Sequence, residues 1–246
     1  MNNSNLPLAI EIEINSDCNL SCSYCPNSKT SRKEKGHMRP AVFENLMRQL
    51  QKRQYSGRIS YHFYNEPTLS PNLELFIKMT STYLPNANSV LYSNGTNLTK
   101  ESVQSLYNSG LKRFVITEHH QQKLSHLDFI SEDLSFASTQ KFKFTNYKKL
   151  PLTNRGGILK VGPKVQTPLQ TACFIPRCVM VVSVMGNVIA FYEDYNQSHV
   201  MGNISELDIY DIWNSEKYIY FREELKKGNR HLFEVCKSCN NQMIIV

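Results

Sequence analysis

The sequence lacks a long hydrophobic run: no apolar stretch approaches the ~18 residues that a membrane-spanning helix requires. The N-terminal stretch MNNSNLPLA also lacks the basic segment and the apolar segment of a secretory signal. These absences predict a cytoplasmic protein with no membrane partner. In that compartment thiols stay reduced, and structural disulfides are rare.

Acidic side chains are fewer than basic ones, with 21 Asp and Glu against 28 Lys and Arg and a formal net charge of +7. The basic residues are spread along the chain, and the notable pairs are Lys148-Lys149 and Lys226-Lys227. A spread of this kind indicates a solvated basic surface, so we expect no nucleic-acid partner. An anionic cofactor or substrate is compatible with it.

The seven cysteines are an odd number, which argues against a complete disulfide framework. They form two groups, and reduced, clustered cysteines usually bind metal. The first group is Cys18, Cys22 and Cys25, and the second is Cys173, Cys178, Cys236 and Cys239.

The first 150 residues alternate short apolar runs with amphipathic stretches, which predicts serial βα units. Such units build a parallel sheet in an α/β fold, with functional loops at the carboxyl ends of the strands. The expected strands are Leu8–Ile14, Arg58–Tyr64, Ser89–Tyr92, Arg113–Thr117 and Lys141–Thr145. The expected helices are Pro40–Arg53, Pro71–Tyr83 and Thr99–Asn108.

From about Thr153 the pattern changes, so we expect two domains, 1–155 and 156–246. TNRGG is a turn-rich junction, and VMVVSVMGNVIAFYED predicts a hairpin with Gly186-Asn187 at its turn. LDIYDIWNSEKYIYFREELKKG predicts helix, and CKSC predicts a short knuckle. The second domain is therefore a small α+β unit.

The first cysteine group follows the first predicted strand, at the face where functional loops gather. Three thiolates are one fewer than a 4Fe–4S cluster normally takes, which would leave one iron open to another ligand. A zinc site would need a fourth ligand, and the nearest histidine is His37.

The pattern C-x3-C-x2-C with an aromatic residue before the last cysteine resembles the radical S-adenosylmethionine (SAM) superfamily. FYNEP and YSNGT resemble its SAM-binding loops, although Asn65 and Ser93 replace the usual glycine and threonine. The resemblance implies a partial (β/α)6 TIM-like barrel that binds SAM and one 4Fe–4S cluster. It implies these SAM contacts: Tyr24, Asn65, Glu66, Asn94 and Thr117.

The second cysteine group resembles the twitch domain, the short form of SPASM, which implies a second, auxiliary 4Fe–4S cluster. Nearly the whole chain resembles twitch dehydrogenases of antibiotic biosynthesis. That likeness implies oxidation of a secondary alcohol of a small, aminocyclitol-like or amino-sugar-like substrate to a ketone. The auxiliary cluster would accept an electron, and a flavodoxin- or ferredoxin-type reductant would supply one. Arg155 would act on the reacting hydroxyl, and Arg155, Glu193 and Tyr92 would bind substrate.

The chain differs from the twitch dehydrogenases in one expected ligand of the auxiliary cluster. Those dehydrogenases have a cysteine ligand two residues before the matching glutamate, where this chain has Phe191. We expect Cys178 to replace it; the competing interpretation makes Cys178 a free thiol that donates a hydrogen atom. Two further functions stay open: maturation of a ribosomal peptide by crosslinking or epimerisation, and a zinc-stabilised module that binds RNA.

Overall fold

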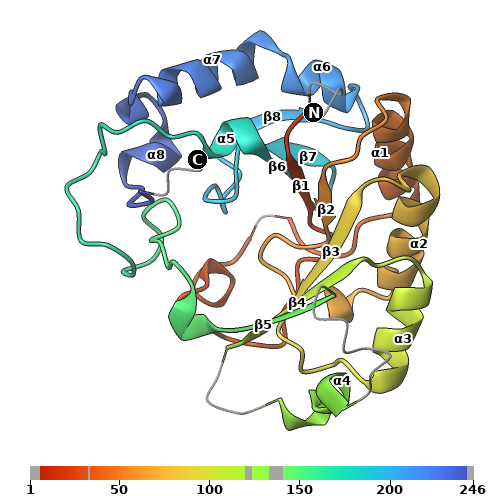
Figure 1. Cartoon of the computed structure of the whole chain (residues 1–246). Coiled ribbons are helices and arrows are strands. Elements are labelled where there is room, and N and C mark those ends of the chain that lie inside the picture. The colour runs from red at the N-terminus through yellow and green to blue at the C-terminus, as the bar shows by residue number, and fades with distance from the viewer. Residues whose placement is uncertain (1–5, 33, 120–123, 133–140, 243–246) are drawn as a thin grey trace.

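The computed structural model describes residues 6–32, 34–119, 124–132 and 141–242 and has an α/β fold (Figure 1). Its sheet has eight strands in the order β5-β4-β3-β2-β1-β6-β7-β8. The parallel strands are β1 (Ala9–Ile12), β2 (Arg58–Ser60), β3 (Asn88–Ser93), β4 (Arg113–Glu118), β5 (Phe142–Asn146) and β6 (Val179–Val182). The antiparallel strands are β7 (Asn187–Ile189) and β8 (Val200–Asn203).

Three long helices, α1–α3, cover the outer face of the sheet (Figure 1). The helices of the N-terminal half are α1 (Pro40–Lys52), α2 (Leu73–Tyr83), α3 (Lys100–Asn108) and α4 (Phe129–Glu132). Those of the C-terminal half are α5 (Ile175–Cys178), α6 (Ile209–Trp213), α7 (Glu216–Lys226) and α8 (Glu234–Lys237). No helix in the described ranges is long and apolar enough to cross a membrane.

Helix α1 shows why the predicted elements form. Proline fits its first turn, where a backbone N–H has no intrahelical partner. Its buried side chains include Val42, Leu46 and Leu50, whose spacing places them on one helical face. That face packs in one core with Ile10 of β1, so the opposite face of the sheet stays available for a site.

The sheet confirms the predicted fold class and shows where its two halves join. The N-terminal half supplies β1–β5, and the sixth parallel strand, β6, comes from the C-terminal half and pairs with β1. All four residues of β6 are buried, so this apolar strand needs neighbours on both sides and finds β1 and β7 there. The domain division at 155/156 stays a prediction, because one sheet spans both halves.

Two elements of the C-terminal half differ in detail from the expectation. The hairpin exists, but its turn is Ser183–Gly186, and Asn187 already begins β7. The predicted helical stretch is two helices, because the Ser215 side chain accepts a hydrogen bond from the Tyr218 N–H and so caps α7.

A buried ion pair joins the end of β1 to the segment after the first cysteines. Arg32 pairs with Glu13, and their side chains are 2% and 0% exposed. The guanidinium carbon lies 4.7 Å from the ring centre of Tyr195, and Glu13 also accepts a 3.3 Å hydrogen bond from the Val184 N–H in the hairpin turn. Burial raises the pKa of Glu13, although the charge of Arg32 acts in the opposite direction. One carboxylate thus ties three segments together.

We expect Glu13→Gln to lower the free energy of unfolding by about 3 kcal/mol, because it leaves the Arg32 charge buried without its partner. Urea denaturation of the reduced chain measures the change. Arg48→Gln, which breaks the exposed pair with Glu44, is the matched control and should change nothing measurable. Equal effects of the two substitutions would contradict the role given to the buried pair.

Candidate active site

A cavity of about 650 Å³ opens at the carboxyl ends of strands β1–β4. The loops after these strands line it, and the segment that follows β5 forms a further wall. The structure therefore brings together sequence positions that lie far apart. The predicted site residues on its wall are Cys18, Cys22, Tyr24, Cys25, Asn65, Glu66, Tyr92, Asn94, Thr117 and Arg155.

The N-terminal cysteine loop presents its three thiols to this cavity. The Cys25 N–H donates a 3.0 Å hydrogen bond to the Cys22 carbonyl, and the Ser28 hydroxyl donates to the carbonyls of both residues. Burial raises the pKa of the Cys18 thiol to about 11. Such thiols lose their protons when a cation stabilises the thiolate, so three thiols on one wall suit a cluster with one open iron.

Glu66 connects the loops after β2 and β3. Its carboxylate is buried, and it accepts 2.8 Å hydrogen bonds from the Ser93 hydroxyl and the Asn94 N–H. Its own N–H donates to the Asp17 carbonyl beside the first cysteine. The neighbouring Asn65, at the position where glycine is usual, donates a 2.8 Å hydrogen bond to Asn15. The asparagine thus stabilises the same loop junction with its side chain.

The loop after β3 has a glycine that the fold requires. Gly95 has φ +77°, and a Cβ at this position would lie 2.9 Å from side-chain carbons of Ile116 and Leu124. The preceding Asn94 donates a 2.8 Å hydrogen bond to Asn19 of the cysteine loop. Close packing and this bond together hold the loop against the thiols.

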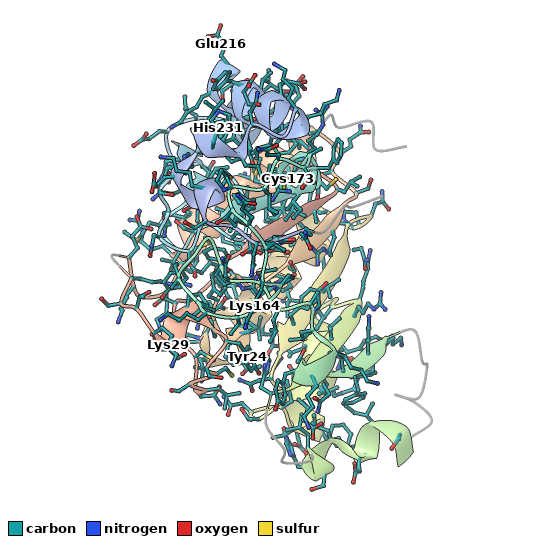
Figure 2. All side chains as sticks on the ribbon, turned by 90° about the vertical axis from the view of Figure 1, so that its left-hand side faces the viewer. Tyr24, Lys29, Lys164, Cys173, Glu216 and His231 are labelled. Carbon is teal, nitrogen blue, oxygen red and sulfur yellow. The ribbon has the colours of Figure 1, made fainter. Side chains whose placement is uncertain are left out.

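Tyr24 lies in an aromatic group that the sequence did not indicate. Its hydroxyl is 2.8 Å from Nδ1 of His119, and its ring stacks on Tyr147 with the centres 5.3 Å apart. Figure 2 shows Tyr24 away from Cys173, in another part of the molecule. His119 follows β4 and Tyr147 follows β5, so the segments after both strands reach the cysteine loop. Thr117, the last residue but one of β4, lines the same cavity.

Inside the barrel, a polar group forms another part of the wall: Glu11, Arg58, His62 and Tyr92. Arg58 donates a 2.9 Å hydrogen bond to Glu11 and a second to the Tyr92 hydroxyl. The His62 ring lies 4.4 Å from that of Tyr92, and burial lowers the pKa of His62. Of these four, sequence reasoning found only Tyr92. The charged positions alternating with isoleucine in IEIEI were the available signal.

Arg155 extends from the NRGG turn to the cavity. The backbone of Arg155 has φ +50°. Gly157 lies two residues later in the same turn, where a Cβ would lie 2.6 Å from Cβ of Ser238, so the turn requires glycine there. The guanidinium lies 5.5 Å from the ring centre of Tyr64. Burial disfavours its charge, but Tyr64 and Glu193 outweigh this effect, so the pKa of Arg155 is raised and the residue stays protonated.

Glu193 lies behind Arg155 rather than on the wall of the large cavity. Its side chain is fully buried, 3.4 Å from Nη1 of Arg155, and it accepts hydrogen bonds of 2.8 Å from Thr153 and 2.9 Å from Asn241. It lines a smaller cavity of about 290 Å³ on the other side of Arg155. A direct contact of Glu193 with a substrate amine stays a prediction.

The C-terminal cysteines divide into a group of three and one apart. Cys173, Cys236 and Cys239 are buried, and burial is the largest cause that raises the pKa of each thiol, to about 12 for Cys239. Cys173 further raises the pKa values of Cys236 and Cys239. Cys178 is half-buried; burial raises the pKa of its thiol, and the charge of Arg177 acts in the opposite direction. Its role as a ligand stays a prediction. Within the described ranges no three His, Cys, Asp or Glu side chains lie close enough to hold a single ion; ligands of a cluster each bind a different iron.

Comparisons with known proteins agree with this arrangement. The radical SAM superfamily model matches residues 12–120, and the model of the iron–sulfur cluster-binding domain SPASM matches residues 173–240. The S-adenosyl-L-methionine-dependent 2-deoxy-scyllo-inosamine dehydrogenase of Niallia circulans is 44% identical over 232 residues, which are 94% of this chain and 92% of the relative. The chain belongs to the radical SAM superfamily.

Two crystal structures of one radical SAM protein resemble this one. BtrN in complex with AdoMet and 2-DOIA has a TM-score of 0.89 and 42% identity, over 98% of this chain and 96% of that chain. SeMet BtrN in an open conformation has a TM-score of 0.76 and 37% identity, over 96% and 93%. This radical SAM chain therefore has a fold more similar to the ligand-bound form.

The predicted cofactors are confirmed: the radical SAM chain binds SAM and two 4Fe–4S clusters. The thiols of Cys18, Cys22 and Cys25, with Glu66 and Asn94 opposite them, fit the SAM cluster and SAM. The three grouped C-terminal cysteines fit the auxiliary cluster. Which residue completes that second site is a separate question.

The triple substitution of Cys18, Cys22 and Cys25 by alanine tests the assignment of the first cluster. We expect iron to fall from about eight to about four atoms per chain, because the auxiliary site keeps its own ligands. Iron and sulfide analysis with EPR of the reduced protein measures this. Iron near zero in the variant would show that the C-terminal cysteines hold no cluster.

Glu66→Gln tests the loop junction. We expect SAM to bind about 10- to 100-fold more weakly, since the amide loses charge-assisted hydrogen bonds to Ser93 and the Asn94 N–H. Equilibrium dialysis of reconstituted protein with labelled SAM gives the affinity. Asn97→Ala, which removes a peripheral bond to Thr68, is the control. An unchanged SAM affinity in Glu66→Gln would disprove this role.

Proposed function

We propose that this chain oxidises a secondary alcohol of a small, amino-bearing cyclic substrate to a ketone. The observation that carries the proposal is the placement of Arg155. Its guanidinium lines the large cavity and pairs with Glu193 beside the auxiliary cysteines. The function of the Niallia circulans relative and the 2-DOIA in the BtrN complex support the same reaction and an aminocyclitol substrate.

The overall change removes one hydrogen atom, one proton and one electron from a carbinol group. When bound, SAM with its reduced cluster supplies the radical that takes the hydrogen atom from carbon, and the auxiliary cluster accepts the electron. The chain positions the substrate, holds the reacting oxygen and keeps water out.

Arg155 acts on the reacting hydroxyl. A guanidinium with a raised pKa donates hydrogen bonds and cannot accept the proton. It stabilises the negative charge that develops on oxygen as the hydroxyl proton passes to a base. His62 on the same cavity wall, whose pKa burial lowers so that the neutral imidazole is favoured, is the base available. Its contacts with Tyr64 and Glu193 restrict the guanidinium to one orientation, so little reorganisation is needed during the reaction.

The polar group inside the barrel binds the rest of the substrate. Glu11 and Glu66 are acids on the cavity wall, and Glu66 serves the SAM-binding loops, so Glu11 is the acid available to pair with a substrate amine. Arg58 and Tyr92 are linked to Glu11 and to each other, and they suit ring hydroxyls. The cavity of about 650 Å³ holds SAM as well as the substrate, so the space left suits a small molecule and favours such a substrate over a folded peptide.

The remaining expectations complete the proposal. The chain works in the cytoplasm, takes electrons from a flavodoxin- or ferredoxin-type reductant, and divides at 155/156 into a SAM-binding core and an auxiliary domain. Tyr24, Asn65, Glu66, Asn94 and Thr117 contact SAM, because all five line the cavity with the first cysteines.

Arg155→Gln should lower kcat for ketone formation about 100- to 1,000-fold, the usual cost of losing one donor to a developing oxyanion. Mass spectrometry of ketone and 5′-deoxyadenosine, with 2-deoxy-scyllo-inosamine as first substrate, follows the reaction. Arg53→Gln, an exposed arginine outside the cavity, is the control and should keep its rate. A kcat within threefold of wild type in Arg155→Gln would remove Arg155 from the chemistry.

A further inference from the structure

The buried residue Arg230 joins the two segments that carry Cys173, Cys236 and Cys239. Its Nε–H donates to the Thr171 carbonyl and its Nη1 to the Asn241 carbonyl, both at 2.9 Å. Thr171 precedes Cys173 by two residues, and Asn241 follows Cys239 by two. Arg230 therefore fixes the two ends of the auxiliary site against each other, and its charge lowers the pKa of the Cys173 and Cys239 thiols against the effect of burial.

Cys178 lies outside this group. It is the last residue of the short helix α5, and it is half-buried, whereas the other three are buried. Its neighbour Arg177 points to the exposed Glu223, 2.8 Å away on α7. Burial and the charge of Arg177 act on the pKa of the Cys178 thiol, whereas the pKa values of Cys236 and Cys239 also respond to Cys173. Three thiolates leave one iron of a 4Fe–4S cluster without a cysteine.

Glu193 is the acid next to that group. Asn241 donates a 2.9 Å hydrogen bond to Oε1 of Glu193, and its N–H lies 3.5 Å from Sγ of Cys239. Thr153 and Arg155 also donate to Oε1, while Oε2 receives just a longer, 3.1 Å bond from the same Thr153 hydroxyl. Oε2 thus accepts fewer hydrogen bonds than Oε1, and the charge of Glu193 is near enough to raise the pKa of the Cys239 thiol, for which burial is the larger cause.

We propose that Glu193 supplies the fourth ligand of the auxiliary 4Fe–4S cluster, through Oε2, and that Cys178 is not a ligand. The inference rests on the proposed role of that cluster as electron acceptor. A carboxylate oxygen is an accepted ligand of iron, and a ligand other than thiolate changes the reduction potential of a cluster. Arg155 then touches both the reacting hydroxyl and a ligand of the electron acceptor.

The experiment uses the full chain with Cys18, Cys22 and Cys25 replaced by alanine, so that the auxiliary cluster is observed alone. Iron, sulfide and EPR are measured after anaerobic reconstitution, with about four irons expected in this parent. Cys178→Ser should keep all of them and an unchanged spectrum. Cys173→Ser should lose the cluster, and Glu193→Gln should lose about one iron and gain an EPR signal in the oxidised state, in which the parent's 4Fe–4S cluster is EPR-silent.

Two further variants keep the result decisive. Glu193→Cys should retain about four irons with a shifted EPR spectrum and potential, and it decides the matter if Glu193→Gln does not fold. Glu234→Gln, an exposed acid of the same domain, is the matched control and should match the parent. Loss of auxiliary iron in Cys178→Ser would overturn the proposal, as would parent-like iron and EPR in both Glu193 variants. None of these readouts depends on turnover, so a failed search for ketone product would count against the proposed function alone.

Discussion

The buried pair of Glu13 and Arg32 is the interaction on which the site depends. Two opposite charges in the interior are stable only together, since each alone would lose its hydration without compensation. The pair joins the end of β1 to the chain just after the first cysteines, and Tyr195 covers the guanidinium from the C-terminal half. The position of the cysteine loop is therefore set from both halves of the molecule.

Further polar contacts lie around the buried pair of Glu13 and Arg32. Tyr195 donates a 3.0 Å hydrogen bond to Asn27, and Glu34 accepts bonds from Ser183 and Asn187 in the hairpin. The loop that carries the SAM-cluster thiols thus rests on the domain that carries the auxiliary thiols. The two metal sites share their support, although they lie in different parts of the sequence.

Periodicity in the sequence predicted the local elements well, because side-chain burial alternates with a fixed period in strands and helices. Helix α1 begins at the predicted Pro40, and β4 begins at the predicted Arg113. The pairing of β1 with β6 had no local signal, since it joins residues about 170 positions apart. Such a contact depends on the whole topology.

The candidate site also contains some residues that the sequence predicted and others that it did not. Motif resemblance found the residues that line the cavity at the strand ends, because their spacing within each loop is visible in the sequence. It did not find Glu11, Arg58 or His62, whose roles depend on facing the barrel interior. It also grouped Cys178 with three other cysteines, and that grouping stays a prediction. The bonds of Arg230 to Thr171 and Asn241, which no local pattern indicates, join the segments that carry Cys173 and Cys239.

The ladder between β1 and β6 runs in continuous register from Ala9↔Val179 to Ile12↔Val182. Backbone hydrogen bonds, rather than a hinge or a flexible linker, therefore set the separation of the two iron–sulfur sites. The site that generates the radical and the site that accepts the electron therefore keep one spacing in every turnover. A substrate therefore sets the distance from its radical carbon to the auxiliary cluster only through the place where it binds in the cavity, because the cluster itself keeps its position.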